Sequence, residues 1–211
     1  MTQEAVIAID GPAGSGKSTV ARAVAARLGV AYLDTGAMYR SVALAALRRG
    51  VDPADAAGVA HVAHDVDIHI DDQVTVDGLD ATKEIRGPEV SRAVSDVAAN
   101  PEVRRELVHR QRQWAEERGR CVVEGRDIGS VVFPNAGLKV YLTASDAARA
   151  GRRSKEGGDV DYDAVAADIA RRDEVDSTRG ASPLVVPEGA EVIDTTGRTV
   201  DEVVEEVLRR L

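Results

Sequence analysis

The chain has 211 residues and a mass of 22.3 kDa, enough for one hydrophobic core with a small inserted subdomain. Its hydrophobic and charged fractions, 44% and 30%, are those of a soluble globular protein. The formal net charge of −9 argues against a general binder of nucleic-acid polymers. Any phosphate groups would therefore have to be bound by locally clustered arginines.

The composition also bears on location. No apolar run approaches the ~20 residues that a membrane-spanning helix needs. Residues 1–4 are not basic, and the first motif follows too early for a cleavable signal peptide. The single cysteine, Cys121, excludes an intramolecular disulfide and favours a reducing cytoplasm. We expect a cytoplasmic monomer in which Cys121 is a small core residue at the start of a strand.

The strongest motif lies near the N-terminus. Residues 11–18 read Gly-Pro-Ala-Gly-Ser-Gly-Lys-Ser and fit G-x-x-x-x-G-K-[ST], the phosphate-binding P-loop. The β-branched run at 5–9 predicts a buried strand before it, and the apolar spacing over 18–28 predicts a helix after it, ended by Gly29. Strand, loop and helix together direct backbone N–H groups and a helix N-terminus at one anion.

Two residues at the end of this motif have separate predicted roles. Lys17 would reach the β- and γ-phosphates of a nucleoside triphosphate, and the Ser18 hydroxyl would ligate Mg²⁺. The plainer interpretation, a turn before an ordinary helix, requires a chance match with the correct flanks on both sides. We therefore predict a nucleoside triphosphate site.

The next segments continue the alternation of strands and helices. A second strand is expected over 30–34, a helix over 35–49 and a turn region over 51–58. Tyr39 and Arg40 lie near the start of this helix, where the carboxyl end of a strand opens onto the ligand crevice of an α/β sheet. A packing tyrosine and a surface arginine are the alternative interpretation.

The pattern changes near residue 65. Polar and apolar residues alternate over 65–70 and 73–77, which predicts half-exposed antiparallel strands, and Asp77-Gly78 predicts a tight turn. We interpret residues 62–95 as a small β-rich insertion. Three histidines near it are expected to be surface residues rather than metal ligands, because no second ligand motif accompanies them: His61, His64 and His69.

Two helices are expected next. The first is amphipathic and covers 89–99. The second begins behind the N-cap Asn100, with Pro101 at its first position, and extends to about residue 118. Its arginines are assigned by default to a solvated face: Arg104, Arg105, Arg110 and Arg112.

A strand expected over 121–124 ends in a charged turn. Arg126 and Asp127 stand between Gly125 and Gly129, just past the carboxyl end of the strand, which is a favoured position for a functional site. A structural salt bridge is the alternative interpretation of the pair.

A further strand over 138–142 leads to an arginine-rich helix. Its Arg149, Arg152 and Arg153 precede the glycines at 157–158, and arginines beside such a loop suit a mobile lid that closes over phosphates. A basic helix end that favours the macrodipole is the competing interpretation. Beyond it we expect a helix over 162–175, a strand over 191–194 and, behind a capping box at Thr199, a terminal helix.

Strands that alternate with helices around a P-loop predict an α/β fold, the doubly wound parallel sheet of a P-loop NTPase. Four segments also resemble the bacterial cytidylate kinases, a branch of the nucleoside monophosphate kinase family: residues 9–19, 33–40, 125–134 and 172–179. Many families share the P-loop, but the Asp-Thr-Gly-Ala-x-Tyr-Arg and Gly-Arg-Asp-x-Gly segments are far more specific. The likeness covers essentially the whole chain.

This resemblance implies an organisation and a reaction. The kinase core would comprise 1–61 and 96–211 with a short lid at about 149–160, and 62–95 would be an inserted monophosphate-binding subdomain. ATP, with Mg²⁺, would donate its γ-phosphate to CMP or dCMP, giving ADP and CDP or dCDP. The partners would be small nucleotides, with no nucleic-acid polymer and no membrane.

The resemblance also assigns residues. The ATP-binding residues would be Gly11, Pro12, Ala13, Gly14, Ser15, Gly16, Lys17, Ser18 and Thr19. The acceptor phosphate would be bound by Arg40, Arg126 and Arg172. Cytosine would face Ser95, Arg104, Asp127 and Arg179, the ribose would face Asp176, and Thr35 and Tyr39 would line the pocket. Catalysis would depend on Lys17, Arg126, Arg149, Arg153 and Arg172, with the arginines at 149, 152 and 153 placed like those that clamp the transferring group.

These residue types suit phosphoryl transfer, which depends mainly on positioning and charge stabilisation. Arginine provides a planar fork and a permanent charge, and the carboxylate of Asp127 is a natural acceptor for the N4 amino group of cytosine. The acceptor phosphate oxygen is already anionic, so no general base is needed.

Three alternatives remain at this point. The first is another small P-loop kinase that acts on a different monophosphate or on a metabolite such as shikimate or gluconate. The second is a guanine-nucleotide switch, which is disfavoured because the Asn-Lys-x-Asp motif is missing from the sequence. The third is a non-catalytic ATP-binding regulator.

Overall fold

The computed structural model describes residues 3–71, 73–157, 162–178, 180 and 182–211. The chain divides into two compact units: the first combines Met1–Tyr32 with Arg118–Leu211, and the second is Leu33–Glu117. Within the described ranges, no helix has the length and the apolar character that would let it cross a bilayer.

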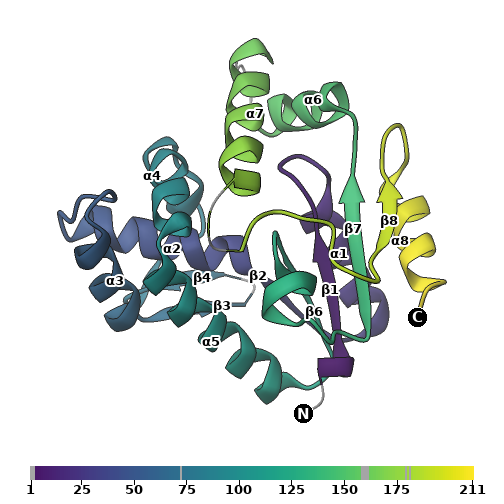
Figure 1. The fold of residues 1–211 in the computed structure, drawn as a ribbon, viewed down its shortest axis with the longest axis horizontal. Coiled ribbons are helices and arrows are strands. Elements are labelled where there is room, and N and C mark those ends of the chain that lie inside the picture. The colour runs from purple at the N-terminus through teal and green to yellow at the C-terminus, as the bar shows by residue number, and fades with distance from the viewer. Residues whose placement is uncertain (1–2, 72, 158–161, 179, 181) are drawn as a thin grey trace. The chain divides into compact units, whose positions relative to one another are not determined.

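A five-stranded sheet has the order β2-β6-β1-β7-β8 (Figure 1), and all of it except the last two residues of β2 belongs to the first unit. Its strands are β1 (Val6–Asp10), β2 (Ala31–Asp34), β6 (Cys121–Gly125), β7 (Leu138–Thr143) and β8 (Glu191–Asp194). The central strand β1 is parallel to both β6 and β7, and β7 is parallel to β8. From β1 the chain thus builds the sheet outward on both sides, which confirms the predicted doubly wound parallel sheet.

Four helices accompany this sheet: α1 (Lys17–Leu28), α6 (Asp146–Gly157), α7 (Tyr162–Thr178) and α8 (Val200–Leu208). The apolar faces of α1 and α8 share one buried cluster with the strands, which includes Ile9, Val24, Leu142 and Val204. Helices α6 and α7 lie side by side in Figure 1 and share a smaller cluster that contains Ala13, so the P-loop packs on them. Short helical turns occupy Gln3–Ala5 and Ile128–Val132.

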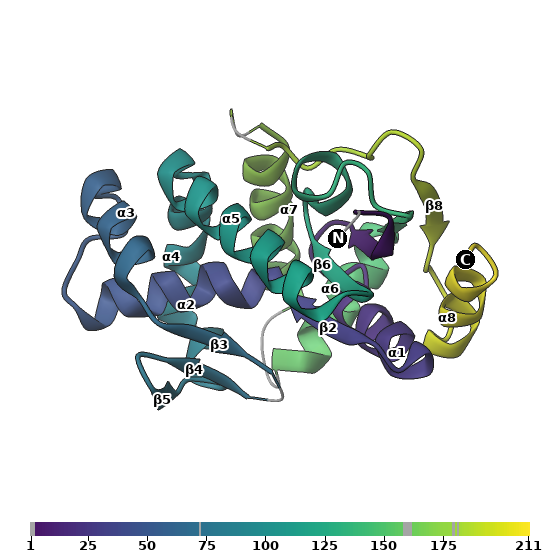
Figure 2. The same cartoon turned by 90° about the horizontal axis from the view of Figure 1, so that it is seen from below.

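The second unit is mainly helical, with α2 (Thr35–Arg48), α3 (Ala56–Asp65), α4 (Pro88–Ala99), α5 (Pro101–Arg118) and a 3-10 turn at Glu84–Arg86. Its small antiparallel sheet consists of β3 (Ile68–Ile70), β4 (Val74–Val76) and β5 (Leu79–Asp80), seen in Figure 2. Asp77 and Gly78 both have positive φ, 51° and 76°, as the turn between β4 and β5 requires. The predicted antiparallel strands are therefore confirmed.

The turn region predicted over 51–58 was wrong in its second half. Helix α3 begins at Ala56, because the Asp55 side chain accepts the Gly58 N–H at 3.1 Å and caps the first turn. Val59 and Val62 then supply a buried apolar stripe. Alanine and glycine at the start of this helix carry almost no periodic signal, so the sequence pattern missed it.

The solvated arginine face predicted for α5 was wrong at two positions. Arg104 is only 4% exposed, and its Nη1 donates to the Ala98 carbonyl at 3.2 Å. Arg110 donates to the carbonyls of His64 and Val66 at 2.7 and 2.8 Å. These carbonyls lie at the C-terminal end of α3, where a cation is favoured by the helix dipole.

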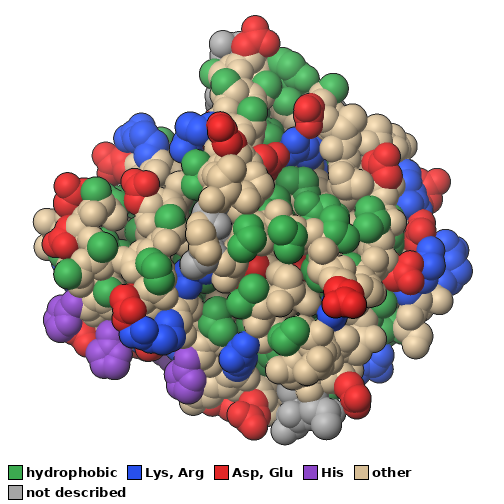
Figure 3. All heavy atoms as spheres, viewed as in Figure 1, with side chains coloured by type: hydrophobic (Ala, Val, Ile, Leu, Met, Phe, Trp, Pro, Cys, Tyr) green, Lys and Arg blue, Asp and Glu red, His purple; other side chains and the backbone are tan. Residues whose placement is uncertain are grey.

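Other surface and core expectations hold. Cys121 is the first residue of β6 and is fully buried, and burial raises the pKa of its thiol to about 11. The His61, His64 and His69 side chains are 79%, 74% and 68% exposed. Figure 3 shows histidine side chains at the surface on the face that it draws.

The capping box of α8 offers a stability test. The Thr199 hydroxyl accepts the Glu202 N–H at 3.3 Å, and the Glu202 carboxylate accepts the Thr199 N–H at 2.8 Å. Thr199→Ala should lower the free energy of unfolding by about 1 kcal/mol, measured by urea denaturation. Thr199→Ser keeps the hydroxyl and is the control; equal losses in both variants would contradict the capping role.

Candidate active site

The P-loop leaves β1 with the geometry that its glycines permit. Gly14 and Gly16 have φ values of 74° and 86°, and α1 begins at Lys17 directly after them. Among the described residues no side chain caps this helix start, so its first N–H groups remain directed at the loop. The Lys17 Nζ lies 3.4 Å from the Pro12 carbonyl oxygen. The arrangement suits a bound polyphosphate.

Side chains hold the P-loop from its carbonyl side. Four carbonyls of residues 11–15 accept hydrogen bonds from three arginines and one threonine. The bonds are Arg126 Nη1 to Gly11 at 3.0 Å, Arg149 Nη1 to Ala13 at 3.2 Å, Arg152 Nη1 to Gly14 at 3.4 Å, and Thr195 Oγ1 to Ser15 at 3.0 Å. Because the C=O and N–H of neighbouring peptide units point apart in such a loop, these bonds favour N–H groups on the opposite, phosphate-binding side.

Two of the three expected lid arginines are thus engaged on the P-loop. Arg149 also pairs with Asp146 and with Asp173, whose carboxylate accepts the Ala13 N–H at 3.3 Å. Arg152 donates twice to Thr195, to Oγ1 at 2.9 Å and to the carbonyl at 2.7 Å. The predicted clamp on a transferring phosphate stays a prediction. Of the proposed lid, residues 149–157 belong to α6, and 158–160 lie outside the described residues.

The turn after β6 lies against the start of the P-loop. Arg126 donates from Nε to Asp176 Oδ2 at 2.8 Å, in addition to its bond to Gly11, and Asp127 is only 4% exposed. Asp10, the last residue of β1, is fully buried and accepts the N–H groups of Ile128 and Gly129 at 2.8 and 2.7 Å. Hydrogen bonds of Arg126 and Asp10 therefore connect this turn to the P-loop and to α7.

Burial and charge act strongly on Asp10. Desolvation raises the pKa of its carboxyl to about 6 from 3.8, although the backbone bonds from Gly129 and Ile128 oppose the rise. The Asp127 carboxylate raises this pKa further, and Lys17 lowers it. Asp10 therefore lies where the P-loop meets the turn after β6, although burial and the Asp127 charge both disfavour its ionised form.

Arg172, one of the expected acceptor arginines, is largely shielded from solvent. Its side chain is 14% exposed, and its Nη2 lies 2.9 Å from Asp168 Oδ2. Burial lowers the pKa of Arg172; the Asp168 charge raises it, and Arg153, Arg171 and Arg126 lower it further. Positive charges that gather around a buried guanidinium form an electrostatic setting that favours an anion. Arg179 lies outside the described residues.

Five further predicted residues lie in the second unit. The Arg104 guanidinium lies over the Tyr39 ring, 5.4 Å from its centroid. Arg40 donates from Nη1 to Ser91 Oγ at 3.0 Å and to the Ile85 carbonyl at 3.3 Å. Thr35 and Ser95 complete the set: Thr35 is buried at the start of α2, and Ser95 is half-buried on α4. Of these five residues, Tyr39 and Arg104 are in direct contact with each other in the second unit.

Several residues without a predicted role contact the predicted site. Asp146 and Asp168 are the ion-pair partners of Arg149 and Arg172, and the others are Asp10, Ser91, Asp173 and Thr195. Asp10 carries a sequence signal, because it ends the strand directly before the P-loop. Asp173 follows Arg172 on one helix. Ser91 and Thr195 contact predicted residues that are distant in the chain, Arg40 and Arg152, and no local sequence pattern marks either contact.

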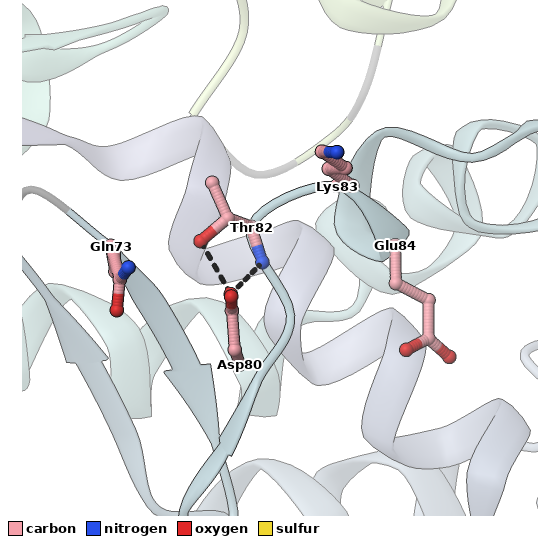
Figure 4. A pocket seen from close by; sticks show the side chains of 5 residues that line it. All are labelled: Gln73, Asp80, Thr82, Lys83 and Glu84. Atoms are coloured by element: carbon pink, nitrogen blue, oxygen red, sulfur yellow. Dashed lines mark hydrogen bonds between the residues drawn. The ribbon is translucent and has the colours of Figure 1, made fainter.

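A separate shallow pocket lies in the second unit (Figure 4), lined by Gln73, Asp80, Thr82, Lys83 and Glu84. Its two carboxylates already have partners. Asp80 accepts the N–H and the hydroxyl of Thr82 at 2.9 and 2.7 Å, and Glu84 pairs with Arg48. None of the described residues that are predicted to bind nucleotide lines this pocket.

Gly14 provides a test of P-loop packing. A Cβ on Gly14 would lie 2.8 Å from the Arg149 carbonyl oxygen, whereas a Cβ on Gly29, at a similar φ of 64°, meets nothing within 4 Å. Gly29→Ala should therefore cost only the ~1–2 kcal/mol of left-handed strain. Gly14→Ala should cost more and also weaken ATP binding at least about tenfold, measured by urea unfolding and ATP titration. Equal ATP affinities in the two variants would contradict the packing argument.

Asp10 should make stability depend on pH. Because its pKa is raised to about 6, the folded state holds the proton more tightly than the unfolded state. The stability that this carboxyl contributes is full below about pH 4 and is lost as the pH rises through 6, on the order of 2–3 kcal/mol. Asp10→Asn does not ionise, so its free energy of unfolding relative to wild type should increase by that amount between pH 4 and 7. A difference independent of pH, in urea unfolding at both values, would contradict the raised pKa.

Comparisons with known proteins agree with this geometry. The family model described as cytidylate kinase matches residues 7–211. A cytidylate kinase from Corynebacterium glutamicum is 50% identical over 212 residues, which cover 96% of this chain and 92% of that protein. One from Symbiobacterium thermophilum is 52% identical over 218 residues, with 99% and 96% covered.

A solved structure of an uncharacterised protein from Eubacterium ventriosum aligns with 97% of this chain and 96% of its own, with a TM-score of 0.53 and 14% identity. A likeness at this identity shows the fold alone. The family match and the two relatives extend over nearly the whole chain and include the P-loop and the turn after β6. The chain therefore belongs to the cytidylate kinase family of nucleotide-binding transferases.

Proposed function

We propose that this protein transfers the γ-phosphate of ATP to CMP or dCMP, giving ADP and CDP or dCDP. The observation that carries the proposal is a P-loop held on its carbonyl side, in the same unit as Arg172, whose pKa is lowered by burial and by the charges of Arg153 and Arg126. Relatives named cytidylate kinase, about half identical over nearly the full chain, support this acceptor. The same relatives give no support to a different monophosphate or to a small metabolite as the acceptor.

ATP and Mg²⁺ suit the residues present. The loop lies so close to α6 at Gly14 that a Cβ there would meet the Arg149 carbonyl oxygen at 2.8 Å, and at Gly16, which also has a positive φ, α1 begins with no side-chain cap from any described residue on its backbone N–H groups. Residues 11–19 would hold the triphosphate, with Lys17 on the β- and γ-phosphates. The exposed Ser18 hydroxyl would ligate Mg²⁺, which neutralises phosphate charge when bound.

The chain's own residues would bind and orient the acceptor. In the first unit, Arg126 and Arg172 would bind its phosphate, Asp176 its ribose, and Asp127 the cytosine amino group. In the second unit, Arg40 would bind phosphate. The remaining predicted contacts of that unit are Thr35, Tyr39, Ser95 and Arg104. Arg149 and Arg153 would stabilise charge on the transferring group, and the segment 149–160 would act as a lid that excludes water.

Arg126 links the donor and acceptor roles. Its guanidinium already bonds the Gly11 carbonyl of the P-loop and the Asp176 carboxylate. A planar guanidinium has five N–H donors, so it can also donate to an acceptor phosphate. Such a group would hold the phosphate oxygen close to the P-loop, and positioning of this kind supplies much of the rate in phosphoryl transfer.

We also propose the remaining features of the organisation. Segment 62–95 would serve as the monophosphate-binding insertion, and the enzyme would work as a cytoplasmic monomer. The net charge of −9 supports small nucleotides, rather than nucleic-acid polymers, as partners.

A panel of acceptors tests the proposal. With ATP and Mg²⁺, turnover should favour CMP and dCMP over UMP, AMP, GMP and shikimate by about 100-fold or more, since a site built around hydrogen bonds rejects bases that leave them unmade. Asp127→Ala should lose this preference. A strong preference for another acceptor would discard the assigned pocket, and ATP binding without any turnover would indicate a regulator instead.

A further inference from the structure

Asp10 lies where the donor and acceptor loops meet. It is the last residue of β1 and the residue directly before the P-loop, and it pairs in register with Gly125, the last residue of β6. Parallel register places its side chain beside the turn that carries Arg126 and Asp127. Asp10 has no exposed surface, so its carboxylate depends entirely on protein donors.

Both carboxylate oxygens are used. Oδ1 accepts the Ile128 N–H at 2.8 Å and Oδ2 accepts the Gly129 N–H at 2.7 Å. The next residue, Gly11, accepts from Arg126 Nη1 at 3.0 Å. Asp10, the last residue of β1, and Gly11, the residue after it, thus hold the turn after β6 through three hydrogen bonds, each with one ionised partner.

An ionised carboxylate is energetically unfavourable at this position. Its burial and the nearby Asp127 charge both disfavour ionisation. A carboxamide of the same shape would avoid the charge, but it has only one oxygen and would set an N–H donor against one of the two backbone N–H groups. Two convergent acceptors in one compact side chain are therefore the property that only aspartate supplies here.

We propose that Asp10 is a positioning residue for the acceptor nucleotide, which acts by holding the Arg126–Asp127 pair in its binding geometry. This inference rests on the proposed function, in which Arg126 binds the acceptor phosphate and Asp127 the cytosine. Asp10 is fully buried and would itself touch neither nucleotide.

The effect should be selective for the acceptor. Loss of the turn's anchor frees Arg126 and Asp127, whereas the P-loop keeps three of its carbonyl bonds, from Arg149, Arg152 and Thr195. The KM for CMP should therefore change more than the KM for ATP. A residue with a general structural role would change both together or neither.

The experiment compares steady-state kinetics of the full chain with wild type, Asp10→Asn and a matched control, Asp52→Asn. Asp52 also holds a backbone N–H, that of Ala54 at 2.9 Å, but in an exposed turn of the second unit. For Asp10→Asn we expect the KM for CMP to rise about tenfold and kcat to fall, with the KM for ATP within about twofold of wild type. The control should match wild type in every parameter.

Circular dichroism and urea unfolding verify that each variant is folded. If Asp10→Asn does not fold, Asp10→Ser, which retains one oxygen acceptor in a smaller side chain, takes its place. An unchanged KM for CMP, or equal increases in the KM for CMP and for ATP, overturns the positioning role while wild-type activity upholds the proposed function. A wild-type chain that phosphorylates neither CMP nor dCMP overturns the proposed function and the positioning role with it.

Discussion

The structure of the first unit depends on how one loop of backbone is held. A phosphate site made from N–H groups has no side chains of its own to fix it, so the opposite edge of the peptide units must be anchored. Here the anchors come from three separate parts of the chain: the turn after β6, helix α6 and the loop after β8. Ala13 also shares an apolar cluster with residues of α6 and α7. Elements distant in sequence thus converge on residues 11–15.

The arginines near the P-loop are paired with carboxylates, although the chain as a whole is acidic. The arginines near the P-loop are accompanied by carboxylates at Asp146, Asp173 and Asp176, which limit the repulsion among cations before any nucleotide binds. Arginine suits this double use, because its planar fork can bond a carbonyl and a carboxylate at once. The same donors remain chemically able to bind phosphate oxygens. A net negative chain can therefore present a positive site without a basic surface.

Much of this was predictable from sequence, since the signals were local. β-Branched runs specified the buried strands, the P-loop fingerprint specified the loop and its helix, and Thr199 with Glu202 specified a capping box. Helix α3 was missed because its start is alanine and glycine, and its cap is a single aspartate. Arg104 and Arg110 were wrongly assigned to a solvated face. The carbonyls that accept their hydrogen bonds belong to the preceding helix α4 and to the end of α3, and the sequence of α5 alone does not show these partners. The bonds of Asp10 depend on sheet register, which a motif does not contain.

The lone thiol has a practical consequence of a different kind. Cys121 is paired through β6 with the central strand, has no exposed surface, and has a pKa of about 11. Reaction with an alkylating reagent needs an accessible thiolate, so it must wait until β6 separates from its neighbours. The rate at which an alkylating reagent labels Cys121 in the native protein therefore measures how often β6 opens at this residue. No probe residue has to be introduced for this measurement.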